Sequence, residues 1–374
     1  MEYNFLFGMD VSSLLSLEKQ GATFKDEKGI TDDLLVILKA AGVQSIRLRL
    51  WVDPKSADGE HYAGGDNDLE TTITLAKRAQ KLGFSIILDL HYSDFWADPG
   101  KQFIPKAWQK LTFSELVRIV YLYTHTVLKR FADEKIKVAY VQVGNEIPNG
   151  MLWPHGKLFD DKGNHISGSY ERLSALLNAG IKAVRELSPH SKIIIHLDRG
   201  GDVKLYREFF GAMYSLLSSF DIIGLSYYPY WHGTFKDLSA NINFLKETYV
   251  EDIMIMETSY AFDAKETHGP FVVTATKTPQ VAGFPPYTKD GQKQYMHELI
   301  NFVAKHEVSG LFYWEPAWIP MVGDSWASKA AIKYIKETHK DVGNEWANQA
   351  LFDYDGHALP ALYVYRNLKK GEQQ

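Results

Sequence analysis

The sequence predicts an α/β protein folded as a (β/α)8 TIM barrel. Eight short segments are rich in Ile, Val and Leu without regular polar alternation, which is typical of parallel strands buried on both faces. Segments with the 3.6-residue periodicity of amphipathic helices separate them. The long connections follow strands, and in a barrel such connections project from the C-terminal face. We therefore expect a single catalytic domain over residues 1–374, with long βα loops on that face.

The eight expected strands are short, as strands in globular proteins usually are. In the first half of the chain they are Asn4–Val11, Gln44–Val52, Phe84–Tyr92 and Ala139–Ile147. In the second half they are Lys192–Asp198, Phe220–Pro229, Asp252–Tyr260 and Gly310–Trp318. The longest connections follow the third, fourth, seventh and eighth of these strands.

The helical segments between the strands have recognisable ends. TDDLLVILKAAG is expected to begin at an N-cap Thr31 and to end before Gly42, because Thr caps free N–H groups and Gly adopts left-handed backbone angles. LETTITLAKRAQKLG ends in the same way at Gly83. A doubly wound open sheet is the competing fold. It normally has a glycine-rich phosphate turn after its first strand, and GMDVSSLLS is not such a turn.

The composition excludes several classes of protein. A net charge of −5 gives no electrostatic reason to expect nucleic acid or an anionic membrane as partner. No apolar stretch is long enough to span a bilayer. The absence of cysteine excludes disulfides, thiolate metal sites and a cysteine nucleophile. MEYNFLFGMD lacks the features of a signal peptide, so we expect either a cytoplasmic protein or an extracellular one whose signal has been removed.

Polar side chains occur at the C-terminal ends of nearly all the expected strands. Barrel interiors are normally filled by branched aliphatic residues, so this pattern indicates a functional site at the barrel mouth. The residues in question are Asp10, Arg47, Arg49, His91, Asp94, Asn145, Glu146, His196, Asp198, Tyr227, Tyr228, Glu257, Trp314 and Glu315.

Two carboxylates in this set face each other across the expected barrel mouth. Glu146 ends the fourth strand and Glu257 ends the seventh. Glycoside hydrolysis needs two carboxyl groups, one that protonates the leaving oxygen and one that attacks or activates water. Each residue could instead form a structural salt bridge with an arginine at the mouth. The pair, together with Asn145, two histidines and Trp314, favours catalysis.

Two other functions compete with a glycosidase. Histidines on barrel strands also occur in metal-dependent hydrolases, but those enzymes usually bring several imidazoles together, and His91 and His196 arrive singly. A carbohydrate-binding barrel without activity would keep the tryptophans and lose a carboxylate. Both Glu146 and Glu257 are present, so the sequence gives that alternative no support.

Longer motifs narrow the class of enzyme. GMDVSSL, RLRLWVDP, LDLHYSDFWADPGKQ, QVGNEIPNGMLWP, METSY, GLFYWEPAWIP and LFDYDGHALPAL extend from Gly8 to about Leu362. Together they resemble glycoside hydrolase family 53, the arabinogalactan endo-β-1,4-galactanases. The resemblance implies endo-acting, retaining cleavage of β-1,4-galactosidic linkages in galactan or type I arabinogalactan, with no cofactor required for catalysis. The alternative is a related retaining barrel enzyme that acts on a mannan or a β-glucan.

The resemblance also implies roles for individual residues. Glu146 would be the acid/base and Glu257 the nucleophile. Arg47 would lower the pKa of Glu257 by its opposite charge, and the charge of Glu257 would raise the pKa of Glu146. Asn145 would donate to the substrate 2-hydroxyl, and Tyr228 would donate to Glu257. The other expected substrate-binding residues are Asp10, Arg47, His91, Asp94, Trp96, Asn149, Trp153, His196, Asp198, Trp314 and Trp318.

Within this set, the two histidines and one tryptophan have more specific expectations. His91 and His196 would orient carboxylates and sugar hydroxyls, and Trp314 would form the floor under the sugar at subsite −1. Five tryptophans lie on expected mouth loops, and some should line an extended sugar groove: Trp96, Trp153, Trp231, Trp318 and Trp326. Trp51 and Trp108 could belong to the groove or to the core. We expect Trp346 to be structural.

A structural calcium ion is a further expectation from the resemblance. Some bacterial members of the family hold Ca²⁺ between the loops after strands seven and eight. Here AFDAKETHGPF offers Asp263, Glu266 and His268 without the dense acidic pattern that calcium prefers. Packing of the aliphatic stretch that follows could stabilise the loop instead. We expect a monomer whose only partner is β-1,4-galactan or a galacto-oligosaccharide.

Overall fold

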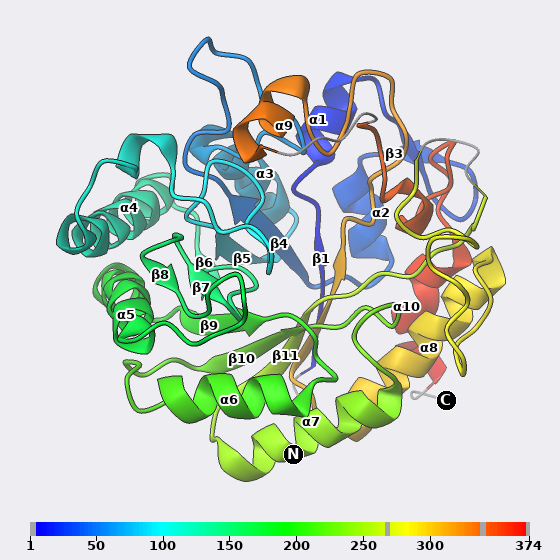
Figure 1. The fold of residues 1–374 in the computed structure, drawn as a ribbon. Helices are drawn as coiled ribbons and strands as arrows, with labels where there is room; N and C mark the ends of the chain where they lie inside the picture. The colour runs from blue at the N-terminus through cyan, green and yellow to red at the C-terminus, as the bar shows by residue number, and fades with distance from the viewer. Residues whose placement is uncertain (1–4, 266–269, 337–341, 372–374) are drawn as a thin grey trace.

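Eight parallel strands close into a barrel in a computed structural model that describes residues 5–265, 270–336 and 342–371 (Figure 1). Neighbouring strands follow the order β1-β12-β11-β10-β9-β6-β5-β4. The (β/α)8 prediction is confirmed, and all eight expected strands are present. They are β1 (Leu6–Asp10), β4 (Ser45–Leu50), β5 (Ser85–Leu90), β6 (Val138–Val143), β9 (Lys192–Leu197), β10 (Ile222–Ser226), β11 (Asp252–Glu257) and β12 (Gly310–Trp314).

Helices surround the barrel, and short elements decorate its loops (Figure 1). The helices are α1 (Leu14–Lys19), α2 (Leu34–Ala40), α3 (Leu69–Lys81), α4 (Phe113–Asp133), α5 (Ser169–Leu187), α6 (Val203–Met213), α7 (Phe235–Thr248), α8 (Lys289–Lys305), α9 (Lys329–Ile335) and α10 (Val364–Gly371). Two small antiparallel ladders pair β2 (Phe24–Lys25) with β3 (Thr31–Asp32) and β7 (Gly150–Met151) with β8 (Gly156–Lys157). Among the described residues, no helix is both long enough and apolar enough to cross a membrane.

The expected N-cap of α2 is wrong by two residues. Asp33 caps this helix, and its carboxylate accepts a hydrogen bond from the Leu35 amide at 2.8 Å. Thr31 is unavailable as a cap because it pairs with Lys25 in the β2–β3 ladder. The expected helix ends are confirmed, since Gly42 and Gly83 both adopt positive φ directly after a C-cap residue.

The barrel interior is aliphatic below the mouth. Side chains from β5, β9, β10, β11 and β12 form a separate buried cluster there, made of Ile87, Ile194, Ile222, Met254, Met256 and Phe312. Phe312 fills space that a side chain on β1 would otherwise take, because a Cβ atom at Gly8 would lie 2.0 Å from its ring. This packed layer fills the barrel interior, so a ligand site is expected at the C-terminal end.

Four strands end in a sharp turn that uses left-handed backbone angles. Tyr92, Glu146, Arg199 and Glu315 follow β5, β6, β9 and β12 with φ between +45° and +50°. This conformation costs a residue other than glycine about 1–2 kcal/mol, and such strain concentrates at functional sites. β6 ends at Val143, short of the predicted end at Ile147. The turn at Gly144, which has a positive φ, then presents Asn145 and Glu146 at the mouth.

Candidate active site

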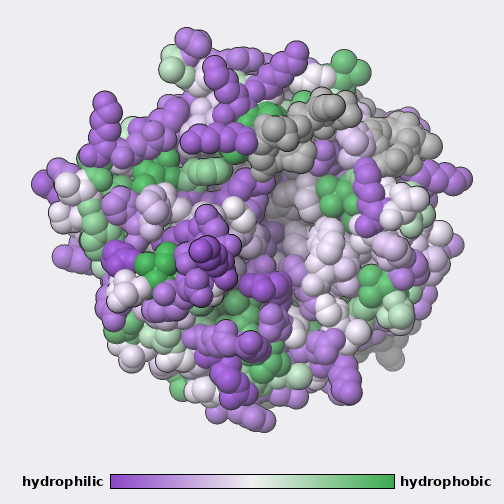
Figure 2. Space-filling view, viewed as in Figure 1, coloured by the Kyte–Doolittle hydropathy of each residue, from purple (hydrophilic) through white to green (hydrophobic). Residues whose placement is uncertain are grey.

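The barrel mouth contains a cavity of about 350 Å³, within the usual size range of ligand sites. Figure 2 shows the molecular surface hollowed near the centre of this face. Both carboxylates that the sequence singles out line this cavity. Its full lining is Asp10, Arg47, Arg49, Asp89, His91, Trp96, Ala97, Asp98, Pro99, Lys101, Asn145, Glu146, Asp198, Tyr228, Trp231, His232, Glu257, Trp314, Trp326, Glu345 and Trp346.

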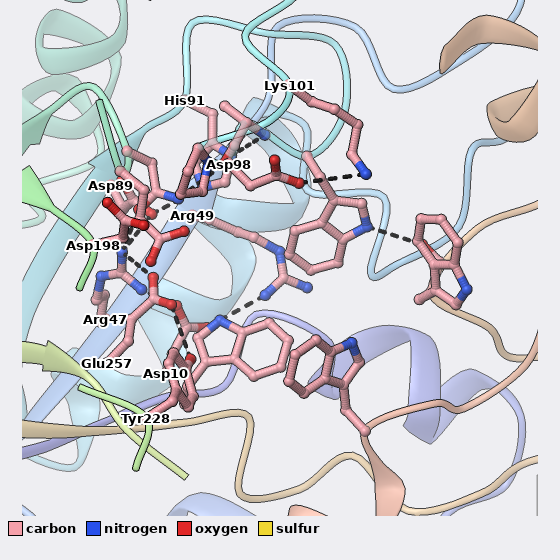
Figure 3. A pocket seen from close by; sticks show the side chains of 18 of the residues that line it. Asp10, Arg47, Arg49, Asp89, His91, Asp98, Lys101, Asp198, Tyr228 and Glu257 are labelled. Carbon is pink, nitrogen blue, oxygen red and sulfur yellow. Dashed lines mark hydrogen bonds and ion pairs between the residues drawn. The ribbon is translucent and has the colours of Figure 1, made fainter. Parts of the chain in front are cut away.

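Arg47 on β4 is the electrostatic centre of the site (Figure 3). Its guanidinium group donates to Asp10 at 3.0 Å and to Asp89 at 2.8 Å, and it lies 2.9 Å from Glu257 Oε1. Burial opposes the charge on Arg47, but these three carboxylates outweigh it and raise its pKa. A buried cation with several anionic partners stays charged, and it fixes the carboxylates around it.

A buried amide on β6 fixes the orientation of Asn145. The Oδ1 atom of Asn145 accepts from Arg47 Nη2 at 3.0 Å and from Gln142 Nε2 at 2.9 Å. Its Nδ2 atom donates to the Ala97 carbonyl at 2.9 Å. Guanidinium groups only donate and carbonyls only accept, so the amide cannot be flipped. No second acceptor for this amide occurs among the described residues, so one N–H of Asn145 remains available to a ligand in the cavity.

Glu257 lies at the end of β11 and is only 6% exposed. Besides Arg47, it contacts Tyr228, whose hydroxyl donates to Oε2 at 3.0 Å, as the sequence led us to expect. Arg47 lowers the pKa of Glu257, as expected, but the effect of burial is larger. Burial raises this pKa above its ordinary value, and Arg47 and Tyr228 only moderate the increase.

Glu146 lies across the mouth and is partly exposed to the cavity. Burial raises its pKa well above the ordinary value, and the negative charges of Glu257 and Asp198 raise it further. The expected direction is confirmed, with burial rather than the neighbouring charge as the larger cause. Glu146 has no arginine partner among the described residues, whereas Glu257 has Arg47. The environment therefore favours ionisation of Glu257 before Glu146.

The two expected histidines are both engaged by protein groups. His91 Nδ1 accepts from Trp51 Nε1 at 3.2 Å and from the Ala97 amide, so its other nitrogen donates to Asp89 at 3.0 Å. His91 thus holds Asp89, which in turn holds Arg47. This contact resolves the open question about Trp51, which is fully buried behind the site. Trp108 is also buried, so both are core residues.

His196 lies behind the cavity and is fully buried. Its ring nitrogens lie 2.9 Å from Asn145 Oδ1 and 2.9 Å from Ser226 Oγ. Burial and the positive charge of Arg47 lower its pKa well below the ordinary value, so the imidazole is neutral. His196 orients Asn145 and does not line the cavity.

Tryptophans form one wall of the cavity. Trp314, at the end of β12, contacts the ring of Trp346 edge-on with 5.1 Å between centroids, and Trp96 stacks on Trp318 at 6.1 Å. The expectation that Trp346 is only structural is wrong, because its half-buried ring lines the cavity. Trp231 and Trp326 line it as well.

Besides His196, four of the expected binding residues lie outside this cavity: Asp94, Asn149, Trp153 and Trp318. The buried carboxylate of Asp94 accepts from the amide and the ammonium group of Lys106, so it anchors a loop. Trp318 is fully buried and donates to Asp324 and Asn344. Trp153 donates to the Asn149 carbonyl, and Asn149 lines a neighbouring hollow.

This second hollow adjoins the first and has a volume of about 690 Å³. Asp198 and Pro99 line both hollows, so they mark the junction. Asp198 Oδ1 is buried and has no hydrogen-bond partner among the described residues. Its other oxygen accepts from Arg199 at 3.2 Å. Burial raises the pKa of Asp198 to about 6.

The expected calcium loop is only partly described. Glu266 and His268 lie outside the described residues. The Asp263 carboxylate accepts from the Lys265 amide and from the Tyr354 hydroxyl at 3.3 Å. Within residues 5–265, 270–336 and 342–371, no group of three or more His, Cys, Asp or Glu side chains has metal-binding geometry.

Sequence reasoning did not single out three residues that hold the site together: Asp89, Gln142 and Ser226. All three are fully buried polar side chains on apolar strands. Asp89 and Gln142 interrupt the runs SIILDL and VAYVQV, and a polar residue inside such a run is the available signal.

Arg49 and Glu315 form a second buried ion pair beside the tryptophans. Glu315 also accepts from the hydroxyl and the amide of Ser13, which ties the end of β12 to the segment after β1. Burial raises the pKa of Glu315 to about 7. The Arg49 guanidinium lies 4.2 Å from the ring centre of Trp96 and supports that wall of the cavity.

Comparisons with known proteins agree with this geometry. Residues 6–365 match the family model described as glycosyl hydrolase family 53. An endo-beta-1,4-galactanase of Bacillus subtilis (strain 168) is 34% identical, with 99% of this chain and 87% of that protein covered. A probable arabinogalactan endo-beta-1,4-galactanase A of Neosartorya fischeri is 37% identical, with 83% of this chain and 84% of that protein covered.

A solved structure is similar over almost the whole fold. It is described as the Ignisphaera aggregans GH53 catalytic domain and is 36% identical, with a TM-score of 0.88. The similarity covers 98% of this chain and 96% of that one. With a family match over nearly its whole length and two carboxylates at the mouth of a (β/α)8 barrel, the chain belongs to glycosyl hydrolase family 53.

Proposed function

We propose that this protein is an endo-β-1,4-galactanase, which hydrolyses internal β-1,4-galactosidic linkages of galactan or type I arabinogalactan with retention of configuration. One observation carries the proposal. Glu146 and Glu257 line one cavity in opposite electrostatic environments, with an arginine and a tyrosine on Glu257 and negative charges around Glu146. Two carboxyls with separated pKa values are what acid catalysis and nucleophilic attack require.

In the first step, Glu257 attacks the anomeric carbon while Glu146 gives its proton to the departing oxygen. Arg47 and Tyr228 favour the ionised form of Glu257, and burial keeps Glu146 protonated. The free N–H of Asn145 faces the substrate, where a bond to the 2-hydroxyl strengthens in the transition state. Trp314 forms the floor under the reacting sugar.

In the second step, water cleaves the glycosyl ester of Glu257. Formation of the ester removes the negative charge of Glu257, which is one of the causes of the raised pKa of Glu146. Glu146 therefore becomes a stronger acid once the ester forms, stays ionised after its proton has left, and can accept a proton from the attacking water. The same residue serves as acid and then as base.

The part of the galactan that leaves in the first step lies on the side of Glu146, because that residue protonates its glycosidic oxygen. The hollow that adjoins the cavity at Asp198 lies on this side, and the Asp198 oxygen without a partner among the described residues would accept from a sugar hydroxyl. The tryptophan wall would bind the part of the galactan that stays attached to Glu257. An open groove of this kind suits an enzyme that cleaves within a chain.

The substrate rests on the names of the relatives, which are galactanases from a bacterium and a fungus. The second candidate is another β-linked glycan, such as a mannan or a β-glucan. We further propose that residues 1–374 act as one catalytic domain, as a monomer, without a cofactor. The substrate-binding set includes Asp10, Arg47, His91, Trp96 and Asp198 at the cavity.

A panel of polysaccharides tests this function. The protein is incubated with potato galactan, mannan, xylan and mixed-linkage glucan, and the released oligosaccharides are profiled over time. Galactan alone should give a ladder of galacto-oligosaccharides from the earliest times. Release from mannan or glucan instead would contradict the substrate, and release of galactose alone would contradict the endo mode. Proton NMR of the first product should show the β-anomer, whereas the α-anomer would mean inversion.

A further inference from the structure

A buried chain of side chains links the two carboxyls behind the cavity. It begins where Ser226 Oγ lies 2.5 Å from Glu146 Oε1, and it continues over 2.9 Å to His196 Nε2. From His196 Nδ1 it reaches Asn145 Oδ1, then Arg47, then Glu257. Ser226 and His196 are both fully buried, so water does not compete for these bonds.

The direction of each hydrogen bond in this chain follows from its neighbours. Asn145 Oδ1 can only accept, so His196 Nδ1 carries a proton and donates to it. A neutral imidazole has one N–H, and His196 Nε2 is therefore an acceptor that faces Ser226. The single hydroxyl proton of Ser226 thus has two acceptors within reach, His196 Nε2 and Glu146 Oε1.

The choice between these two acceptors depends on Glu146. When Oε1 of Glu146 carries the proton, it donates to Ser226, and the Ser226 hydroxyl donates to His196. When the proton is on the other oxygen or has left with the departing sugar, Oε1 is bare and the Ser226 hydroxyl donates to it. Glu146 gives up one proton and later regains it. No other proton enters or leaves this series of hydrogen-bonded side chains.

We propose that Ser226 is a positioning residue whose hydroxyl donates to His196 when Oε1 of Glu146 carries the proton and to Glu146 whenever Oε1 is bare. The inference rests on the proposed acid/base role of Glu146. By donating to Oε1, Ser226 leaves the acidic proton on the oxygen that faces the substrate. After proton transfer, the same bond stabilises the carboxylate that must act as base. His196 supplies the acceptor when Oε1 carries the proton, and Asn145 holds it in the required tautomer.

Other charged groups also act on Glu146 and limit what Ser226 alone can do. Glu257 on β11, Asp198 after β9 and Asp98 after β5 all raise its pKa, and burial raises it most. Ser226 on β10 opposes them. Removing the Ser226 hydroxyl should therefore raise the pKa of Glu146 and make the ionised form less available. The rate of the second step, which needs the ionised form of Glu146 as base, should fall more than the rate of the first step.

The test compares Ser226→Ala with Ser226→Thr, which keeps a hydroxyl, and with Ser45→Ala. Ser45 is a matched control because its buried hydroxyl bonds to Ser85 at the opposite end of the barrel. The substrate is a dinitrophenyl β-galactobioside, whose leaving group needs no acid help, so the second step limits turnover. Ser226→Ala should lower kcat about tenfold or more, because the hydrogen bond lost is one to an ionised group. A burst of phenolate should precede the slow phase.

The pH dependence of kcat/KM on galactan gives the second readout. Its alkaline limb reports the acid form of Glu146 and should move to higher pH in Ser226→Ala, but not in Ser226→Thr or Ser45→Ala. An unmoved limb with unchanged kcat in Ser226→Ala would overturn the inference. Equal losses in the Ala and Thr variants without a pH shift would also overturn it, since that pattern means packing alone. Glu146→Ala separates the two claims: a fast second step in that variant would refute the acid/base role itself.

Discussion

The hydroxyl of Tyr228 gives a direct test of how the site controls Glu257. In Tyr228→Phe, Glu257 Oε2 loses a donor at 3.0 Å, and Arg47 on Oε1 remains. The ring keeps its contacts with Trp231 and Trp346, so the cavity wall is preserved. The change therefore affects the charge of the nucleophile and little else.

The size of the effect follows from the hydrogen bond. A hydrogen bond to an ionised group contributes about 1.5–3 kcal/mol, and 1.36 kcal/mol corresponds to one pKa unit, so the pKa of Glu257 should rise by about 1–2 units. Because Glu257 must be ionised to attack, the acid limb of kcat/KM should move to higher pH by the same amount. Well above that limb, this effect on the rate disappears.

The assay is a pH profile of kcat/KM on galactan for the wild type, Tyr228→Phe and Tyr227→Phe. Tyr227 is the matched control, because its hydroxyl donates to the Gly233 carbonyl away from the cavity. Its profile should coincide with that of the wild type. An acid limb in Tyr228→Phe that is unmoved, or that moves to lower pH, would show that the Tyr228 hydroxyl does not favour the ionised form of Glu257.

Three further predictions concern the cavity walls and the loop after β11. Trp346→Ala should lower kcat/KM on galactan about tenfold, the usual effect of losing a buried aromatic contact of about 1.4 kcal/mol, while Trp108→Ala should act on stability instead. Equal effects on stability and affinity in both variants would contradict this. Asp198→Asn should move the alkaline limb of kcat/KM to lower pH, because it removes a negative charge that raises the pKa of Glu146. If the loop containing Asp263 binds Ca²⁺, as expected from the resemblance, EDTA should lower the melting temperature and added Ca²⁺ should restore it; an unchanged Tm would contradict the expectation.

Much of the barrel could be predicted because its strands are buried on both faces. Apolar runs such as SIILDL and KIIIHL are typical of parallel strands buried on both faces. Their alternation with amphipathic helices predicts an α/β fold with a parallel sheet. The cavity could be predicted in part for a related reason. A residue such as Glu257, directly at the end of a barrel strand, has its position set by the barrel itself.

The features that could not be predicted depend on contacts between residues far apart in the sequence, or on how deeply a side chain is buried. Trp346 lies far beyond the end of β12, with α9 between them, and nothing in its neighbouring sequence shows that it returns to the barrel mouth. The pKa of Glu257 depends on a balance between burial and Arg47, and only the arginine is visible in the sequence. Asp33, and not Thr31, caps α2 because Thr31 pairs with Lys25 on β2.

Trapping the covalent intermediate tests the nucleophilic role of Glu257 most directly. The protein is treated with a dinitrophenyl 2-deoxy-2-fluoro-β-galactobioside, digested, and analysed by mass spectrometry. The fluorine slows both steps, and the good leaving group lets the first proceed, so the ester accumulates. One labelled peptide is expected, with the sugar on Glu257. A label on Glu146, or no label in protein that remains active, would contradict that role.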